Sequence, residues 1–176
     1  MPELELVAIF GVFTAAGAVI LLLAALLRLA LARVSPGFDS ERDTSRPVVV
    51  LDGSNVMHWK DGKPDLQPVR DVIADLAQRG YRAGVVFDAN AGYKLEGRYR
   101  HHQVLARQLG LPQNRVMVVN KGEVADEMVL RVAQDFGARV VSNDRFRDWR
   151  DDFPQVAEPG FLISGRYRQG ALQLDL

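Results

Sequence analysis

The chain has 176 residues, a formal net charge of 0 and no cysteine. A neutral chain has no general attraction for polyanions, so any such binding must come from a local arrangement of charge. The absence of cysteine excludes disulfides, thiolate zinc sites and cysteine nucleophiles. Any metal site must therefore use oxygen or histidine ligands.

The N-terminal segment is far more apolar than the rest of the chain. No residue from Leu6 to Leu27 is charged. A helix rises about 1.5 Å per residue and needs about 20 such residues to cross a bilayer. The alternative is a cleaved signal peptide, but that would begin with a basic region, whereas this chain begins with Glu3 and Glu5. We expect residues 1–33 to form one transmembrane anchor.

The charges beside this segment predict its orientation. Arg28 and Arg33 follow the apolar run, and no Lys or Arg precedes it. The positive-inside rule then places the N-terminus outside and the C-terminal domain in the cytoplasm, as a single-pass membrane protein. Small residues at Gly11, Ala15 and Ala18 could let two such helices pack closely as a homodimer.

The remaining chain predicts a linker and one folded domain. Residues 34–46 combine Pro, Gly, Ser and alternating charges, which is typical of a flexible linker. Residues 47–176 are long enough and apolar enough to bury a core of their own.

The domain alternates between two kinds of pattern. Short apolar runs predict buried strands at residues 48–51, 83–87, 116–119 and 140–142. Amphipathic segments predict helices at residues 66–78, 96–109 and 125–136. Residues 161–163 and 171–174 could complete the fold as a strand or hairpin. This order predicts an α/β fold, a Rossmann-like three-layer sandwich with a mostly parallel sheet between two layers of helices.

Acidic residues gather where the predicted strands end, at the edge where parallel sheets place their functional groups. They are Asp52, Asp88, Asp126, Glu127, Asp144 and Asp148, and the polar residues at the same edge are Ser54, Asn55, Ser142 and Asn143. Clustered carboxylates repel one another unless a cation neutralises them, and an all-oxygen set favours Mg²⁺ or Mn²⁺. Such an ion can activate water to hydrolyse a phosphodiester.

Most of these acids also have a structural explanation. Asp126 and Glu127 stand in the first turn of a helix, where the helix dipole favours acids. Asp144 could cap a short helix, and Asp88 could belong to a turn. Asp52 is different, because an acid after the run VVVL and before Gly-Ser-Asn has no evident capping task.

Three motifs in the right order resemble those of a known family. They are DGSNV at residues 52–56, ADE at 125–127 and VSNDRFRD at 141–148. Over residues 47–153 the sequence resembles the NYN-type, PIN-like ribonucleases, the branch that includes the regnase group. The resemblance implies a PIN-like sheet and a divalent-metal endoribonuclease that acts on single-stranded or structured RNA.

The resemblance also implies roles for individual residues. Asp52 matches the first-strand metal ligand, and Asn55 its polar neighbour. Asp126 matches the first acid of a pair on the third helix, and Asp144 the acid after the fourth strand. The resemblance further implies supporting roles for Asp88 and Asp148, and Asn143 is a supporting candidate from its place at the same edge.

Two departures from the family are visible. The regnase-like enzymes have Asp-Asp where this chain has Asp126-Glu127, so the longer Glu127 alters the geometry of any metal site that it joins. The zinc finger of the regnase group is also absent, as the lack of cysteine requires.

A local basic stretch follows the second predicted strand, interleaved with Tyr93 and Tyr99. Its cations, with two more beside Asp144, are candidate RNA contacts: Lys94, Arg98, Arg100, His101, Arg145 and Arg147. The alternatives are an ordinary solvated helix face and, for the last two, ion pairs with neighbouring acids.

The leading interpretation is a membrane-anchored, Mg²⁺- or Mn²⁺-dependent ribonuclease with Asp52, Asp126 and Asp144 as catalytic acids and Glu127 as a further metal ligand. The alternatives are an RNA-binding scaffold that has lost activity, suggested by Glu127, and a phosphohydrolase for small molecules. The last lacks the Asp-x-Asp pattern expected after the first strand, because Gly53-Ser54 follows Asp52.

Overall fold

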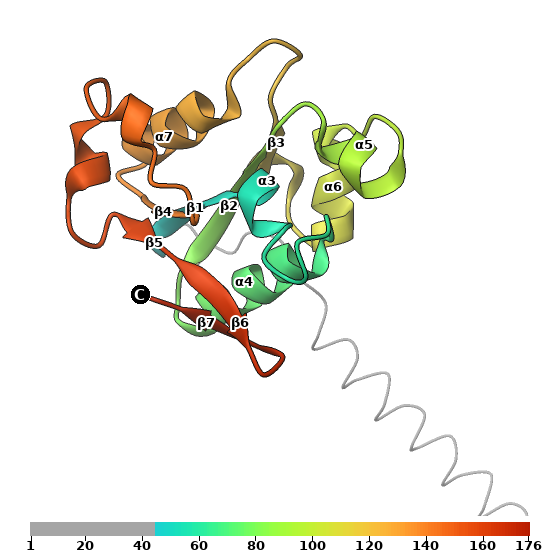
Figure 1. Ribbon diagram of the computed structural model, residues 1–176, viewed down its shortest axis with the longest axis horizontal. Coiled ribbons are helices and arrows are strands. Elements are labelled where there is room, and N and C mark those ends of the chain that lie inside the picture. Colours follow the sequence, from blue (N-terminus) through green and yellow to red (C-terminus); the bar gives the residue numbers. More distant parts are fainter. Residues whose placement is uncertain (1–44) are drawn as a thin grey trace, which may run out of the picture. The chain divides into compact units, whose positions relative to one another are not determined.

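A computed structural model of the protein describes residues 45–176 (Figure 1). These residues lie within one compact unit, Asp39–Leu176. The predicted anchor over residues 1–33 lies outside the described residues, as does most of the predicted linker. Among the helices of residues 45–176, none is both long and apolar enough to cross a bilayer.

The core of the domain is a five-stranded parallel sheet with the strand order β3-β2-β1-β4-β5. The strands are β1 Val48–Asp52, β2 Arg82–Phe87, β3 Val116–Val118, β4 Arg139–Val141 and β5 Leu162–Ile163. The central strand β1 buries Val49, Val50 and Leu51 completely. A parallel strand covered on both faces needs such a continuous apolar run, so the predicted α/β fold with a mostly parallel sheet is confirmed.

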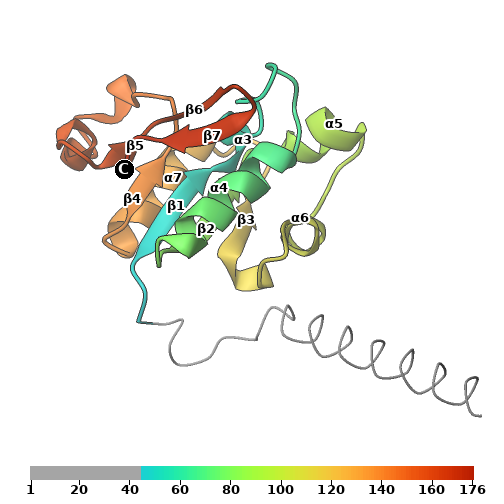
Figure 2. The same ribbon diagram turned by 90° about the horizontal axis from the view of Figure 1, so that it is seen from below.

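Helices cover both faces of this sheet. They are α3 Gly53–Val56, α4 Gln67–Gln78, α5 Ala91–Glu96, α6 His102–Leu109 and α7 Ala125–Asp135, with short 3₁₀ turns η1 Gln113–Arg115, η2 Arg147–Trp149 and η3 Pro154–Ala157. Figures 1 and 2 show α4 and α6 on one face and α7 on the other. Along β1, Val49 and Leu51 join the core with α4 and α6, whereas Val50 joins the core with α7.

The helix predicted over residues 96–109 is wrong at its N-terminal end. Helix α5 ends at Glu96, and α6 starts only at His102. Between them Gly97 adopts a left-handed conformation with φ of 69°, and its N–H donates to the Tyr93 carbonyl. A glycine in this conformation ends a helix, because the chain leaves the helical path there.

The C-terminal residues form a hairpin, β6 Gly165–Arg168 and β7 Ala171–Leu174, as one of the two predicted options. Leu172 and Leu174 pack against the core on the α4 side of the sheet. The Tyr167 hydroxyl donates a hydrogen bond to Asp71 of α4. The hairpin is therefore fixed to the body of the domain.

Candidate active site

Asp52 lies at the end of β1, where the chain turns directly into α3. Its side chain is only 5% exposed. One carboxylate oxygen accepts the Asn55 N–H at 3.0 Å, so Asp52 caps α3, a task that the sequence had not indicated. The other oxygen accepts the Ser142 hydroxyl at 2.9 Å. These two bonds hold the carboxylate at the carboxyl edge of the sheet.

The surroundings of Asp52 oppose its ionisation. Burial is the largest cause and raises the pKa of this carboxyl to about 6, although the bonds from Asn55 and Ser142 lower it. The charges of Asp126 and Asp144 raise the pKa further. Desolvation and nearby like charges are the two conditions that a cation would relieve.

Asp126 stands in the first turn of α7, where the helix dipole should lower its pKa. The pKa of this half-buried carboxyl is instead raised, first by burial and then by the charge of Asp144. The dipole alone therefore does not account for Asp126. Its electrostatic environment is that of an acid cluster.

Asp144 follows β4 in a tight turn. One of its carboxylate oxygens accepts the Phe146 N–H at 2.7 Å, and its own N–H donates to the Ser142 hydroxyl oxygen at 3.0 Å. Ser142 thus links Asp144 to Asp52. Asp144 does not cap η2, because that turn begins after Phe146, which is buried in a left-handed conformation with φ of 46°.

The other predicted acids have different surroundings. Glu127 pairs with Arg131 one helical turn along α7. Asp88 accepts the Asn90 N–H and the Lys94 ammonium, both at 2.8 Å. Asp148 is exposed in η2. The structure therefore couples Asp52, Asp126 and Asp144 electrostatically, and engages Glu127 and Asp88 in ion pairs.

Two asparagines frame the site. The Asn55 side-chain oxygen accepts the indole N–H of Trp59 at 2.8 Å and the backbone N–H of Asn143 at 3.0 Å. Asn143 in turn bonds to Gly165 of the hairpin. Sequence reasoning had missed Trp59 and Gly165. The i, i+4 spacing of Asn55 and Trp59 could have indicated the first, whereas no local signal marks Gly165.

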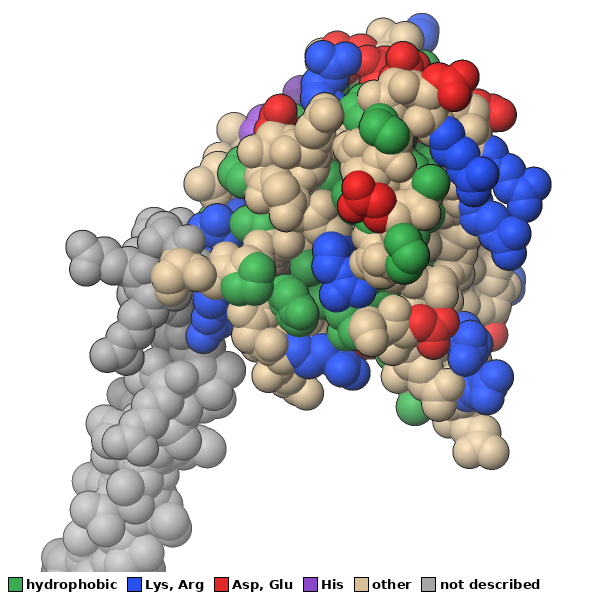
Figure 3. Space-filling view, turned by 90° about the vertical axis from the view of Figure 1, so that its left-hand side faces the viewer, with side chains coloured by type: hydrophobic (Ala, Val, Ile, Leu, Met, Phe, Trp, Pro, Cys, Tyr) green, Lys and Arg blue, Asp and Glu red, His purple; other side chains and the backbone are tan. Residues whose placement is uncertain are grey.

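The predicted RNA contacts lie in two segments. In the first, Lys94 pairs with Asp88, while Arg98 and Arg100 both pair with Glu96. His101 stacks edge to face with Tyr99, and the ring centroids are 4.7 Å apart. In the second segment, Arg145 and Arg147 are exposed beside Asp144. Figure 3 shows acidic side chains gathered at one end of a face that also carries Lys and Arg.

The donor chemistry of the acid cluster fits a hard divalent cation. In residues 45–176 no three His, Asp or Glu side chains come close enough together to hold an ion between them. Mg²⁺ usually keeps several waters and needs only one or two carboxylates, which matches three acids of which two are only partly buried or exposed.

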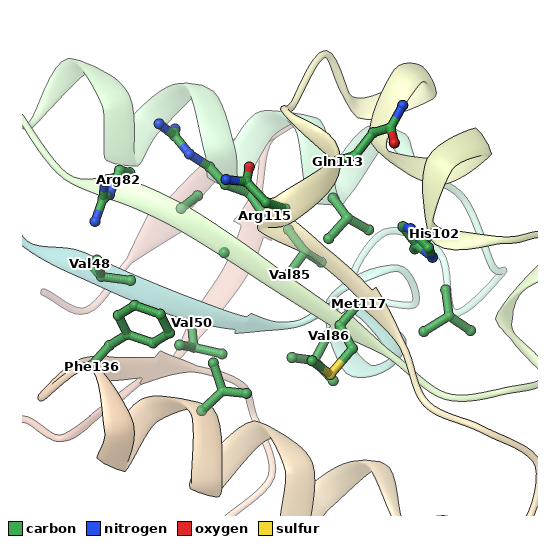
Figure 4. A pocket seen from close by; sticks show the side chains of 16 residues that line it. Val48, Val50, Arg82, Val85, Val86, His102, Gln113, Arg115, Met117 and Phe136 are labelled. Atoms are coloured by element: carbon green, nitrogen blue, oxygen red, sulfur yellow. The ribbon is translucent and has the colours of Figure 1, made fainter. Parts of the chain in front are cut away.

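A separate groove of about 560 Å³ lies on the sheet face beside α7. In Figure 4 the side chains of Met117, Val86 and Phe136 border it, with Arg82 and His102 at its margins. No residue of the acid cluster lines this groove.

The coupled acids after β1, at the start of α7 and after β4 lie at the carboxyl edge of a parallel sheet, where open α/β sheets bind their ligands. Residues 45–159 match the family model of the Zc3h12a-like ribonuclease NYN domain. The match spans more than half of the chain, which therefore belongs to this family. The resemblance seen in the sequence is confirmed.

Solved structures show related folds. Two structures of nuclear protein-only RNase P 2 from Arabidopsis thaliana superpose with TM-scores of 0.55 and 0.54, at 17% and 18% identity, over 87% of this chain and 35% of theirs. At such identities the likeness shows the fold alone. The PIN domain endonuclease Utp24 gives a TM-score of 0.37 at 15% identity, over 73% of this chain and 90% of that one. Among curated proteins, none matches this chain.

The chain thus spans about a third of the length of the RNase P proteins that it resembles. The family model is that of a ribonuclease NYN domain, and the structural likeness adds the fold.

Proposed function

We propose that the protein is a divalent-metal-dependent endoribonuclease whose active site is the cluster of Asp52, Asp126 and Asp144. The observation that carries the proposal is the shared electrostatics of these acids, because the charges of Asp126 and Asp144 both act on the buried Asp52. An arrangement that costs stability without a cation is typical of a functional site.

In this proposal Asp52, Asp126 and Asp144 would bind Mg²⁺ or Mn²⁺ partly through the ion's own waters, since the three carboxylates do not all lie within direct reach of one ion. The bound ion supplies a water of lowered pKa and neutralises charge on the phosphate. The protein's own contribution is to fix the carboxylates. Ser142 donates to Asp52 and accepts from the Asp144 backbone, so one hydroxyl orients both acids.

RNA would bind along the α5–α6 segment, which follows β2 and so starts at the same edge of the sheet. Tyr93 and Tyr99 are 54% and 47% exposed, and exposed rings are suited to stacking on unpaired bases. Arg98 is exposed beside them and can contact a phosphate. The predicted substrate is accordingly single-stranded RNA or the unpaired part of a structured one.

The test is cleavage of a single-stranded RNA by the full-length chain, with Mg²⁺, with Mn²⁺ and with EDTA. We expect internal cleavage that EDTA abolishes, and a loss of at least about 100-fold in Asp52→Asn and in Asp144→Asn. Asp135→Asn is the matched control, because Asp135 is exposed at the far end of α7. Equal rates for Asp52→Asn and the wild type would refute the proposal.

A second candidate function is RNA binding without cleavage. The observation that favours it is the pairing of Glu127 with Arg131, which engages this carboxylate away from the cluster. RNA binding by a wild-type chain that cleaves nothing at millimolar Mg²⁺ or Mn²⁺ would support this second function.

The membrane anchor over residues 6–27 and the cytoplasmic location of the domain are also part of the proposal. Their support is the uncharged run and the arginines that follow it.

A further inference from the structure

The C-terminal hairpin touches the loop that carries Asp144. The family match ends at residue 159, so β6 and β7 lie beyond it. The Asn143 side chain donates to the Gly165 carbonyl at 2.9 Å and accepts the Gly165 N–H at 3.0 Å. An amide side chain that pairs with both backbone groups of one residue fixes that residue in distance and in direction.

The same loop is held from a second side. The Asn143 backbone N–H donates to the Asn55 side-chain oxygen at 3.0 Å, and the Trp59 indole N–H donates to that same oxygen at 2.8 Å. Asn143 is therefore bonded through its backbone to α3 and through its side chain to β6. Asp144 is the next residue in the chain.

The close packing of Trp59 against Gly165 completes the contact. A Cβ atom at Gly165 would lie 2.2 Å from Cζ3 of Trp59 and 2.7 Å from Cδ2 of Leu174. No real contact is so short, so only glycine fits without displacing the indole or the hairpin. Trp59, Asn55, Asn143 and Gly165 thus form a closed ring of contacts, which we call the hairpin clamp.

We infer that the hairpin clamp positions the carboxylate of Asp144 for the reaction, with Asn143, Trp59 and Gly165 as positioning residues. The inference rests on the proposed function of the acid cluster. A displaced Asn143 moves the Asp144 backbone, whose N–H bonds to Ser142, and Ser142 also holds Asp52. Small displacements in such a supporting shell weaken metal binding and slow the reaction.

Gly165→Ala in the full-length chain is the first test. Gly84→Ala is its matched control, since a Cβ there meets nothing closer than a backbone oxygen at 3.9 Å. We expect Gly165→Ala to lower kcat about 10- to 100-fold with KM within about twofold. The dissociation constant of Mn²⁺, measured directly by titration, should rise about 10- to 100-fold.

Hydrogen exchange provides a readout that needs no activity. Amides of residues 143–146 should exchange at least about tenfold faster in Gly165→Ala, and those of β1 and α7 at the wild-type rate. If the control and Gly165→Ala show the same exchange, Mn²⁺ affinity and kcat, the inference is wrong. If the wild type binds no Mn²⁺ and cuts no RNA, the proposed function fails, and the exchange rates still decide whether the hairpin holds the loop.

Two milder variants keep the test valid if Gly165→Ala does not fold. Asn143→Ala removes both bonds to Gly165 from an exposed residue, and Trp59→Phe removes only the indole N–H while keeping a ring against the glycine. We expect the same changes in exchange and Mn²⁺ affinity in both, with Trp59→Phe the smaller. Wild-type behaviour of both variants would overturn the inference.

Discussion

At the scale of single residues, Asp52 is subject to two opposing effects on its pKa. It caps α3 and binds Ser142, which stabilises its charge, yet its burial raises its pKa to about 6. Capping alone would not require a buried acid beside two others. The combination is what a metal ligand requires, because the ion offsets the cost of burying the charge.

The raised pKa of Asp52 predicts how stability depends on pH. In the unfolded chain the group titrates near 3.8, and in the folded chain near 6, so between these values only the folded state keeps the proton. Stability should therefore fall as the pH rises from about 4 to about 6, by about 3 kcal/mol from this group. Urea unfolding of the wild type and of Asp52→Asn in EDTA, over this pH range, measures the free energy of unfolding that tests this prediction.

Asp52→Asn has no carboxyl group at this position, so its stability should not fall between pH 4 and pH 6. The variant should therefore be more stable than the wild type at pH 7 but not at pH 4. Adding Mg²⁺ at pH 7 should raise the melting temperature of the wild type and leave that of Asp52→Asn unchanged. A wild type whose stability rises between pH 4 and pH 6 relative to the variant would contradict the assignment.

The neighbouring acids Asp126 and Glu127 should contribute very differently to metal binding. Asp126 has a pKa raised by burial and by Asp144, whereas Glu127 pairs with Arg131. Asp126→Asn should weaken Mn²⁺ binding at least about tenfold, and Glu127→Gln should change it less than about threefold. Titration of Mn²⁺ by calorimetry checks both. A larger effect from Glu127→Gln would make that residue a direct ligand.

At the scale of elements, α3 follows β1 without a loop because its first residue is glycine. A Cβ at Gly53 would lie 2.6 Å from Cε1 of the fully buried Phe87 on β2. The DGSN motif therefore combines an acid, a close approach between α3 and β2, and the Ser54 hydroxyl that accepts the Asp88 N–H at 2.8 Å. The motif therefore has a structural role beside the one proposed for Asp52 in the active site.

Gly53→Ala should accordingly destabilise the domain by about 1–3 kcal/mol, because the added methyl group would overlap the ring of the fully buried Phe87. Gly84→Ala on the same sheet should be close to neutral. The double variant Gly53→Ala with Phe87→Leu should recover part of the loss, because the shorter side chain leaves room for the added methyl group. Chemical denaturation of the wild type, the two single variants and the double variant measures the recovery. Full additivity of the two single changes would contradict the proposed contact.

At the scale of the whole molecule, positive and negative residues balance at 22 each, so RNA binding has to depend on local geometry. Lys94, Arg98 and Arg100, the cations of the α5–α6 segment, are partly neutralised by Asp88 and Glu96. Tethering of the domain at a membrane would add a high local concentration of any substrate held there.

The predicted anchor is tested with the whole chain. When it is expressed in cells, the full-length protein should sediment with membranes. High salt should not extract it and detergent should release it, because an apolar helix is held in the bilayer by hydrophobic burial and not by charge. Replacing Leu21, Leu22 and Leu23 with Lys should move it to the soluble fraction. Release of the wild type by salt alone would contradict the anchor.

Much of the fold could be read from the sequence, because parallel strands and amphipathic helices carry periodic apolar patterns that are local. The runs that form β1 and β2 and the helices α4 and α7 were predicted within one or two residues. The helix predicted over residues 96–109 began too early, because the left-handed conformation of Gly97 and the non-helical residues that follow it are not visible in the apolar pattern.

The acid cluster was likewise predicted in part from the sequence and decided in part by the tertiary structure. The positions of Asp52, Asp126 and Asp144 after strands and at a helix start were determined by the sequence alone, since topology brings those ends to one edge. Tertiary structure decided the rest: which acids act on the buried Asp52, that Glu127 pairs with Arg131, and that Gly165 bonds to the loop of Asp144. Those outcomes depend on contacts between residues far apart in the chain, and no local pattern encodes them.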